Sequence, residues 1–519
     1  MAPSTSRPPL PLPLSLSLLS LQLVTLLLAS ATAPASASSA PDSASFALTH
    51  TLVADVPRRF VSFSIEVSKA PDVFLVGGLG GAPRASFARL MNALRGAAGD
   101  AGGAMIRVGG NSADESAYLP SGDLPNGTTY RITDADLDAY AAAVPAWNGS
   151  LVLDTTLRYP GAQGTALDVA HIAAAVARNG VGFGLLEGVE IGNEVDLFYE
   201  NGIRNPSYVY NDYAPEFKKA NDALAPVLAP GGRPRIQGAT WCSNHWTIAN
   251  FSHYVASFGA SFGSISIHRY AESVCHNDKA TIAGLMADKS AAGLAAAAQP
   301  YVAAAGAIPV YIGEGNSVSC GGAKGVSDVW ASALWALDVL FNVAAVGFRR
   351  WSFHGMPEGA YSTVVFPSGA DDVAQVQPMF YGLWAFASAT ANGSEILAVT
   401  TTHSSNALIK CWSVKDASGA SRVVVIHKDP AATQNATITI APPGRLSGTA
   451  SIVRGLPGAK GMLAAWSDDV SFGGLSFSAT TDGSPSGAPA SESLPANGGG
   501  DFVFALPPAS FAILSLPAQ

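Results

Sequence analysis

The sequence predicts an α/β fold, a (β/α)8 TIM barrel followed by a C-terminal β-sandwich domain. From residue 60 to about 355, short β-rich runs alternate with longer helical patterns, which is typical of βαβ units. The first run is followed by Val67-Ser68-Lys69-Ala70-Pro71 and not by the glycine-rich turn of a doubly wound sheet. Past about residue 395, short strand-like runs are separated by Gly, Pro, Asn and Asp, a pattern typical of a β-sandwich.

Eight strand-like runs define the predicted barrel, and a closed (β/α)8 barrel requires eight. They cover residues 60–66, 104–109, 151–156, 187–192, 235–240, 264–270, 309–314 and 346–353. The predicted helices between them cover residues 85–98, 133–143, 166–179, 207–228, 279–304 and 326–345. Several of these helices begin next to Asp, Ser or Thr, which are good N-cap residues. We therefore place the barrel domain at residues 58–375.

The predicted sandwich domain covers residues 376–519. Its strand-like runs are ALIKCWSV, SRVVVIHKD, ATITIAP, TASIVRG, VSFGGLSFSA, DFVFALP and SFAILSLP. A further strand-like run at 45–53 precedes the barrel, and we expect it to add an edge to the same sandwich. The stretch from Thr480 to Gly500 has low complexity, so we expect an exposed loop there.

Residues 1–37 have the pattern of a secretory signal peptide. They carry one charge, Arg7, then an apolar run from Leu16 to Leu28, and end in Ala35-Ser36-Ala37. A membrane anchor is the alternative, but it would need about twenty uninterrupted apolar residues. We expect a secreted, extracellular mature chain without a membrane span. Sequons for N-glycosylation favour the same interpretation, at Asn126, Asn148, Asn250, Asn392 and Asn435.

The composition excludes several classes of protein. Hydrophobic residues make up 48% of the chain, so it is not disordered as a whole. It has 29 Lys and Arg against 38 Asp and Glu, a net charge of −9 and no basic run, so we expect no nucleic-acid partner. Cys242, Cys275, Cys320 and Cys411 lie far apart and lack the close pairs of zinc sites. In an oxidising compartment these four are disulfide candidates, with three pairings open.

Two glutamates stand where a barrel of this kind carries its active site, at the carboxyl ends of strands. Glu194 follows the fourth predicted strand and Glu314 ends the seventh. A pair of carboxylates is the minimum apparatus for hydrolysing a glycoside, because one protonates the leaving oxygen and the other attacks the anomeric carbon. Asn193, directly before Glu194, can hydrogen-bond the sugar hydroxyl next to the reacting carbon. This chemistry requires neither metal nor cofactor, and we expect none.

The motif Gly192-Asn193-Glu194, taken with Glu314, is similar to that of the retaining glycosidases built on (β/α)8 barrels. Longer stretches resemble the glycoside hydrolase family of fungal β-glucuronidases and heparanase, family 79. These stretches are 60–66 (FVSFSIE), 106–114 (IRVGGNSAD), 313–322 (GEGNSVSCGG), 325–328 (GVSD) and 335–338 (WALD). The resemblance covers most of residues 45–390 and is weaker in the terminal sandwich.

The resemblance implies that Glu194 is the acid/base and Glu314 the nucleophile of a double displacement with net retention. Their carboxyl groups should then lie about 5–5.5 Å apart. Because Glu194 must hold its proton until the glycosidic bond breaks, we expect a mildly acidic pH optimum.

The resemblance also implies a set of residues that bind the sugar or support the glutamates. They are Asn193, Tyr270, Tyr361, Glu66, Arg107, Asn111, His268, Ser319, Cys320 and Gly321. Tyr270 matches a tyrosine that hydrogen-bonds the nucleophile, whereas Arg107 is equally well interpreted as a structural partner of a carboxylate. The loop 319–321 would help to receive the carboxylate of a uronic acid, and a Cys275–Cys320 disulfide would tie the loops after strands six and seven together. Val195 and Gly315 depart from the family pattern, which has proline and threonine there, and this puts the shape of the pocket in doubt.

These inferences predict a secreted, exo-acting retaining β-glucuronidase whose partner is a glucuronate-containing glycan, with 4-O-methylglucuronate as a second candidate glycone. We expect a monomer or weak oligomer. An endo-acting heparanase-like glycosidase stays open, although few Lys and Arg are available to line a cleft for a densely anionic glycan. A catalytically inactive carbohydrate-binding or cell-wall protein also stays open, although it would have no chemical reason to retain both glutamates.

Overall fold

The computed structural model describes residues 41–517, except 101, 160, 179–180, 243–244, 368, 445 and 479. The predicted signal peptide at 1–37 therefore lies outside the described residues. Within the described part of the chain, no helix combines the length and the apolar character needed to cross a membrane.

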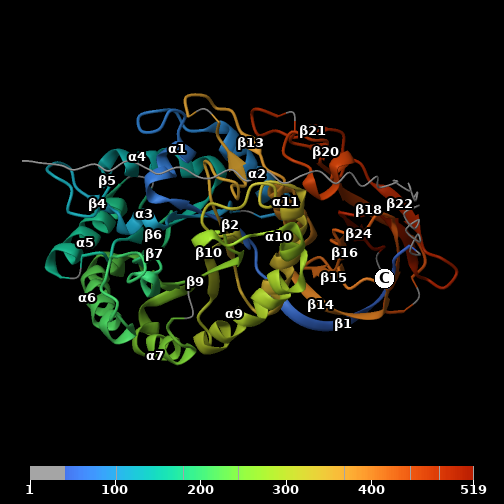
Figure 1. Ribbon diagram of the computed structural model, residues 1–519, viewed down its shortest axis with the longest axis horizontal. Helices are drawn as coiled ribbons and strands as arrows, with labels where there is room; N and C mark the ends of the chain where they lie inside the picture. The colour runs from blue at the N-terminus through green and yellow to red at the C-terminus, as the bar shows by residue number, and fades with distance from the viewer. Residues whose placement is uncertain are drawn as a thin grey trace, which may run out of the picture. The chain divides into compact units, whose positions relative to one another are not determined.

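Parallel strands close into an eight-stranded barrel, which confirms the predicted fold class (Figure 1). In chain order they are β2 (Val61–Glu66), β3 (Met105–Gly109), β6 (Ser150–Thr155), β7 (Leu186–Ile191), β8 (Ile236–Trp241), β9 (Phe262–Glu272), β10 (Val310–Val318) and β11 (Trp351–His354). Neighbours in the chain are neighbours in the barrel, and β11 closes it against β2. The strands form because they are short apolar runs buried on both faces, as in β6, where every residue is buried.

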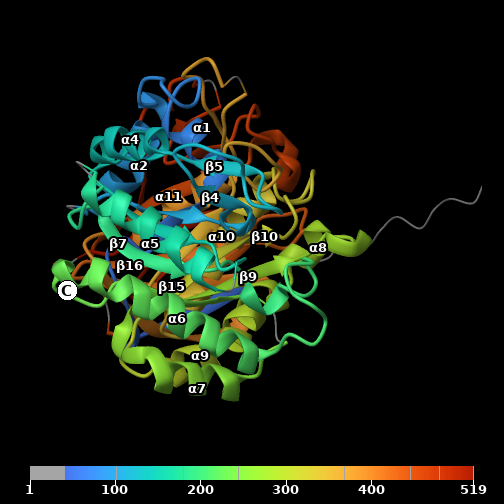
Figure 2. The same cartoon turned by 90° about the vertical axis from the view of Figure 1, so that its left-hand side faces the viewer.

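Helices cover the outside of the barrel (Figure 2). The longer ones are α2 (Ala85–Ala98), α4 (Asp134–Ala143), α5 (Ala162–Ala177), α6 (Tyr210–Leu228), α7 (Ile248–Phe258), α9 (Ala292–Ala305), α10 (Trp330–Ala345) and α11 (Met379–Ala389). Short helices are α1 (Ala70–Phe74), α3 (Asn111–Asp114) and α8 (Ile282–Met286), and the small strand pairs are β4 (Ser116–Tyr118) with β5 (Tyr130–Ile132) and β12 (Val364–Val365) with β13 (Gln375–Val376). Helix α6 is amphipathic: its buried residues recur every three or four positions, from Tyr210 through Tyr213 and Phe217 to Leu228.

A second, mostly antiparallel sheet of the described chain forms the other domain (Figure 1). Its strands are β1 (Ser43–Val56), β14 (Ser394–Ser404), β15 (Ile409–Asp416), β16 (Ser421–His427), β17 (Ala436–Ala441), β18 (Thr449–Leu456), β19 (Ser471–Phe472), β20 (Leu475–Ser476), β21 (Ser486–Gly487), β22 (Glu492–Pro495), β23 (Phe502–Leu506) and β24 (Ser510–Ser515). Strand β1 lies between β14, with which it is antiparallel, and β17, with which it is parallel. Side chains from both ends of the sheet, such as Ile438 and Ile452, share one buried cluster, so the sheet folds over its own core as a sandwich does.

Helices α10 and α11 lie between the barrel and this sheet (Figure 1). Phe341 of α10 stacks on Trp412 of β15, with ring centroids 5.3 Å apart. A buried ion pair crosses the same junction, because Lys428 Nζ lies 2.6 Å from Asp338 Oδ2 and both side chains are almost fully buried. The two domains therefore share a continuous, well-packed interface.

The structure differs from the predicted elements in several places. The helix predicted at 279–304 is two helices, α8 and α9, because the backbone turns extended at Ala287. The last barrel strand begins at Trp351 and not at 346, since Gly347 turns the chain with a φ of 99°. Strand β14 and helix α11 were not predicted. The low-complexity stretch 480–500 is mostly exposed, but it contains β22, which pairs with β18.

A buried ionic cluster holds the amino-terminal ends of the barrel strands together. Glu187 of β7 accepts hydrogen bonds from Arg350 (2.6 Å) and from the Ser150 hydroxyl (2.7 Å), and Arg59 lies 3.4 Å away. Burial alone would raise the pKa of Glu187, but the charges of Arg350 and Arg59 outweigh it and lower the pKa to about 2.

Glu187→Gln is therefore expected to destabilise the barrel at neutral pH. The carboxyl has its ordinary pKa of 4.5 when unfolded and about 2 when folded, which corresponds to roughly 3 kcal/mol at 1.4 kcal/mol per pKa unit. A lowered pKa stabilises above pH 4.5, and the contribution is lost as the pH falls toward 2. Urea unfolding of both proteins at several pH values should show a difference that shrinks below pH 4.5. A difference that does not change with pH, or one matched by the exposed control Glu395→Gln, would contradict this.

Candidate active site

Glu194 and Glu314 meet at the carboxyl end of the barrel. Glu194 follows β7 and Glu314 lies in β10, and both are at least nine-tenths buried. One oxygen from each carboxylate and a ring nitrogen of His268 all lie within 4.8 Å of one another. The barrel thus brings together two residues that lie 120 positions apart in the sequence, because both follow the carboxyl ends of its strands.

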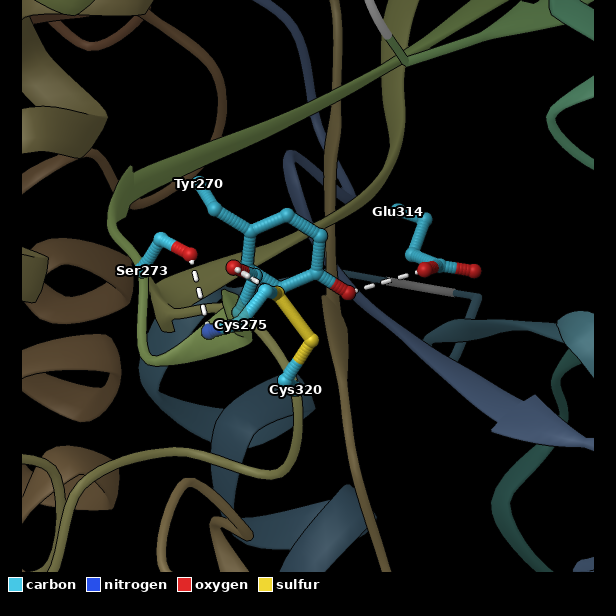
Figure 3. The surroundings of a disulfide bond; sticks show 6 residues. Tyr270, Ser273, Cys275, Glu314 and Cys320 are labelled. Carbon is cyan, nitrogen blue, oxygen red and sulfur yellow. Dashed lines mark hydrogen bonds between the residues drawn. A yellow bond between two sulfur atoms is a disulfide. The ribbon is translucent and has the colours of Figure 1, made fainter. Parts of the chain in front are cut away.

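The Glu314 carboxylate is surrounded by hydrogen-bond donors. Tyr270 donates to Oε1 (2.8 Å), as Figure 3 shows, and Arg107 donates to Oε2 (2.6 Å). His354 and His268 lie 3.5 and 3.9 Å from the same Oε2. Burial would raise the pKa of Glu314, but these two imidazoles, Arg107 and the Tyr270 hydroxyl lower it far below its usual range. Glu314 is therefore held ionised, as a nucleophile must be.

Arg107 of β3 is the centre of a buried polar network. Its guanidinium donates to Glu190 (2.5 Å), Glu314 (2.6 Å) and Asp154 (3.1 Å). It also donates to the oxygen atoms of the Asn193 amide (2.8 Å) and the Ser64 hydroxyl (3.1 Å). Burial would lower the pKa of Arg107, but the three carboxylates raise it. We expected Arg107 among the sugar-binding residues; because it is fully buried and all its donors are engaged, it supports the carboxylates instead.

Glu194 lies in a tight turn after β7. Its φ is 49° and that of Gly192 is 79°, both in the left-handed region, and its backbone N–H donates to Thr240 O (3.1 Å). His268 Nδ1 lies 2.9 Å from Glu194 Oε1. His268 was also expected to bind sugar, but its side chain is fully buried, so it orients Glu194 from below.

Asn193 joins this turn to the neighbouring strand ends. Its Nδ2 donates to Asn111 Oδ1 (3.0 Å) and its Oδ1 accepts from Arg107. Its backbone N–H donates to Asp114 Oδ2 (2.7 Å). Asn111 is exposed whereas Asn193 is 3% exposed, so Asn111 is the more open of the two to a ligand.

A second carboxylate and imidazole flank Glu314 on the side of β11 and β2. His354 Nδ1 lies 3.0 Å from the Ser64 hydroxyl oxygen, and its Nε2 lies 3.6 Å from Glu66 Oε1. Burial would lower the pKa of His354, but Glu314 and Glu66 raise it. Burial also opposes ionisation of Glu66, yet His354 and the Ser112 hydroxyl lower the pKa of Glu66. The His354 imidazole is thus held between two carboxylates, which favour its protonated form.

Tyr361 lies over this group. Its ring meets the His354 ring edge-on at 5.8 Å, and burial together with Glu314 raises the pKa of its hydroxyl. Its backbone carbonyl accepts from Asn316 Nδ2 (2.9 Å). The structure therefore places Tyr361 beside the glutamates, as the sequence predicted.

The loop after β10 is joined to the loop after β9 by a disulfide. Cys275 and Cys320 are bonded (Figure 3), whereas Cys242 and Cys411 are free thiols. The Cys320 sulfur is consumed by this bond, so only its backbone is available to a substrate. The Ser319 hydroxyl lies 3.2 Å from Cys275 Sγ, and Gly321 O accepts from Ala360 N (3.0 Å). These contacts hold the loop but do not involve either glutamate.

Removing the disulfide with Cys275→Ala/Cys320→Ala is expected to lower the free energy of unfolding. The bond joins residues 45 positions apart, and a closed loop of that length corresponds to roughly 4 kcal/mol in the chain-entropy account. The same variant should raise KM, because the bond lies next to Tyr270 (Figure 3). Urea unfolding and steady-state kinetics would check both effects. The free-thiol variant Cys411→Ala is the control, and an equal loss in both variants would show that the bond has no special role.

The two departures from the family pattern have different structural settings. A Cβ on Gly315 would lie 2.3 Å from the Arg269 carbonyl oxygen, so no larger residue fits there without a shift of the backbone. Val195 is fully buried beside the turn, where it contacts Gly192.

The cluster of Glu194, His268 and Glu314 is close enough to be considered as a metal site. The surroundings of this cluster disfavour a metal ion, because both oxygens of Glu314 already accept hydrogen bonds from Tyr270 and Arg107. A metal ion there would lie against the Arg107 guanidinium and be repelled by it.

Several residues of the site were not singled out from the sequence. His354 ends β11, and the strand-end rule would have found it had the strand not been predicted to end at 353. Glu190 and Asp154 point into the barrel from β7 and β6 and meet Arg107 there. No local sequence signal identifies these two, since their partner lies on another strand.

Comparisons with known proteins support the fold. No protein-family model matches the chain, and no curated protein matches its sequence. Among solved structures, a 4-O-α-L-rhamnosyl-β-D-glucuronidase from Fusarium oxysporum 12S in complex with Rha-GlcA has a TM-score of 0.73 and 19% identity, over 91% of this chain and 100% of that chain. A GH51 arabinofuranosidase from Xanthomonas axonopodis pv. citri has a TM-score of 0.63 and 13% identity, over 92% and 100%.

The catalytic domain of GH30 xylanase C from Talaromyces cellulolyticus has a TM-score of 0.52 and 12% identity, over 91% and 100%. At these identities the likeness establishes the fold alone: the chain shares with these three glycoside hydrolases a (β/α)8 barrel joined to a β-sheet domain.

Proposed function

We propose that the chain is an exo-acting retaining β-glucuronidase that hydrolyses glucuronate-containing glycans. The observation that carries the proposal is the separation of the two buried carboxylates, whose oxygens approach within 4.8 Å. Retaining glycosidases hold their carboxyl groups about 5–5.5 Å apart, whereas inverting enzymes need about 6.5–9.5 Å to admit a water molecule between acid and base.

In the first step Glu314 attacks the anomeric carbon while Glu194 protonates the departing glycosidic oxygen. The C–O bond to the leaving group breaks, and an ester bond forms between the sugar and Glu314. Tyr270 and Arg107, which hydrogen-bond the two oxygens of Glu314, keep the nucleophile ionised and aim it. Asn193 would hydrogen-bond the sugar hydroxyl next to the reacting carbon, a contact that tightens as positive charge develops there.

In the second step Glu194, now ionised, takes a proton from water, and the resulting hydroxide displaces Glu314 from the sugar. Esterification removes the negative charge of Glu314, so Glu194 changes from acid to base within one cycle. His268, at 2.9 Å from Glu194, keeps the carboxyl group oriented in both steps.

Glucuronate as the glycone is supported by two observations. The protein from Fusarium oxysporum, which shares the fold over 91% of this chain, is a glucuronidase solved with Rha-GlcA. Here, against burial, Glu314 and Glu66 raise the pKa of the His354 imidazole, and a proton held on this ring would offset part of the negative charge that a uronate brings to a site with several carboxylates.

The proposal is tested with a panel of p-nitrophenyl glycosides: the β-D-glucuronide, the β-D-glucoside, the β-D-xyloside and the α-L-arabinofuranoside. We expect turnover of the glucuronide alone and, by NMR of the first product, retention of the β configuration. Glu194→Ala with added azide should yield the β-glucuronyl azide, because azide needs no general base. Turnover of another sugar would reassign the substrate class, and an inverted product would overturn the mechanism.

We further propose that the enzyme acts outside the cell. The signal-like segment at 1–37 and the Cys275–Cys320 disulfide both support an oxidising destination. Expression of the full chain with a C-terminal tag in a eukaryotic host should place a shortened product in the medium. Retention of the full-length chain inside the cell would contradict this.

A further inference from the structure

Asp114 is a buried carboxylate that joins the ends of three barrel strands. It closes α3, directly after β3, and is 1% exposed. Its Oδ1 accepts from the backbone N–H of Leu157 (2.6 Å), which follows β6, and from the Thr156 hydroxyl (3.3 Å). Its Oδ2 accepts from the backbone N–H of Asn193 (2.7 Å), which follows β7. No local feature of the sequence marked this residue as part of the site.

The turn that Asp114 holds is a strained one. Gly192 and Glu194, on either side of Asn193, both have positive φ, a region that is unfavourable for a non-glycine residue such as Glu194. A Cβ on Gly192 would lie 2.8 Å from Leu157 Cβ, so the turn is also packed tightly. Such a conformation persists only where its surroundings fix it.

Two sides of the turn are fixed by different partners. On the side of β8, Thr240 accepts from the Glu194 N–H (3.1 Å), and its hydroxyl donates to Gly192 O (2.6 Å). On the side of β3, Asp114 holds the Asn193 backbone, and Asn111 of the same short helix accepts from the Asn193 side chain. The α3 segment therefore holds Asn193 at both its backbone and its side chain.

We propose that Asp114 is the positioning residue of the acid/base Glu194. Its carboxylate fixes the backbone N–H of Asn193 and thereby directs the Glu194 carboxyl group toward the glycosidic oxygen. Asp114 is buried and accepts hydrogen bonds from Thr156, Leu157 and Asn193, so it acts through the turn. This inference rests on the proposed function, because it assigns Asp114 a role in that reaction.

The test compares wild type with Asp114→Asn on three substrates: phenyl, p-nitrophenyl and 2,4-dinitrophenyl β-D-glucuronide. An asparagine keeps one oxygen acceptor and cannot accept from both backbone N–H groups. A misplaced Glu194 carboxyl slows the reaction only where the leaving group needs a proton. The kcat/KM of the variant should therefore fall about 100-fold on the phenyl glucuronide. On the dinitrophenyl glucuronide, whose leaving group departs unaided, the loss should be less than about fivefold.

The ratio of the kcat/KM losses on the phenyl and dinitrophenyl glucuronides, measured on one preparation, does not depend on how much of the variant is folded. Burial raises the pKa of Asp114 to about 6, so a neutral amide at this position removes a charge that burial disfavours, and the variant should fold. Asp114→Ser is a second variant with the same expected ratio. Asp136→Asn is the matched control, since Asp136 is also buried but lies in α4, where it accepts hydrogen bonds from Thr133 and Tyr130.

An equal loss on all three substrates, or no loss, would overturn the inference while leaving the proposed function intact. A folded wild type that hydrolyses none of the three would overturn the proposed function, and the role of Asp114 in it would fall at the same time. Azide gives a further check: it should raise kcat on the dinitrophenyl substrate for Asp114→Asn and not for Asp136→Asn, because only the former has a misplaced general base.

Discussion

Glu314→Gln is expected to lower kcat on p-nitrophenyl β-D-glucuronide by about 10⁴-fold or more. The amide cannot form the glycosyl ester, and loss of a nucleophile in a covalent mechanism removes nearly all of the chemical acceleration. It also removes the negative charge that lies beside Arg107 and His354. Because the site then repels an anionic uronate less, the variant should still bind the sugar. Steady-state kinetics measure the loss, and titration with glucuronate measures the binding that remains.

A matched control separates this effect from a general effect of removing a carboxylate. Glu272 lies at the end of β9 on the same rim, pairs with Lys289 at 3.2 Å and does not contact either catalytic candidate. Glu272→Gln should leave kcat within about threefold of wild type, because its partner Lys289 lies outside the site. In wild type, a 2-deoxy-2-fluoro glucuronide with a good leaving group should add one sugar to the peptide that contains Glu314. Labelling of any other peptide would contradict the assignment.

The barrel could be predicted closely because its strands are local features of the sequence. Each is a short apolar run bounded by turn residues, and the predicted run 104–109 differs from β3 by one residue. The ends were less predictable where pairing between strands decides them. β9 and β10 continue past the predicted ends because Asn316 pairs with Tyr270 and Val318 with Glu272, a contact between segments far apart in the chain.

Helix α11 was missed for the opposite reason. It is apolar on almost every side, and nearly all of its residues are buried, because it lies between the barrel and the β-sheet. A helix buried all round has no amphipathic period, so the pattern that identified α6 was absent.

The residues of the candidate site that lie at the ends of barrel strands could be predicted from the sequence. Glu194, Glu314 and Tyr270 are among these residues, and the structure brings them together. The supporting network was not predictable, because Arg107 meets Glu190 and Asp154 only when β3, β6 and β7 stand side by side. The sequence thus indicated the two candidate glutamates and Arg107 as a possible carboxylate partner, but not Glu190 and Asp154, which share that arginine.

Arg107→Met is expected to reduce both stability and activity, and to reduce stability by more than any other substitution in this network. The change leaves Glu190, Asp154 and Glu314 buried without their shared cation, and an unpaired buried charge typically costs about 3–5 kcal/mol. Activity should fall because Glu314 loses the hydrogen bond at 2.6 Å that aims it. Arg107→Lys keeps the charge but not the five fixed donors, so its losses should be intermediate.

The substitution of Arg107 should also shift the pH profile of kcat/KM in a definite direction. Against burial, Arg107 is one of the groups that lower the pKa of Glu314, so its removal raises that pKa. Glu314 must be ionised to react; the acidic limb of the kcat/KM profile should therefore move to higher pH in Arg107→Met. Arg84→Met is the matched control, because Arg84 is just as buried but donates to the carbonyl oxygens of Leu75 and Asp371. Arg84→Met should lower the free energy of unfolding and leave the pH profile in place, and a shift of equal size in both variants would show that Arg107 acts on the fold alone.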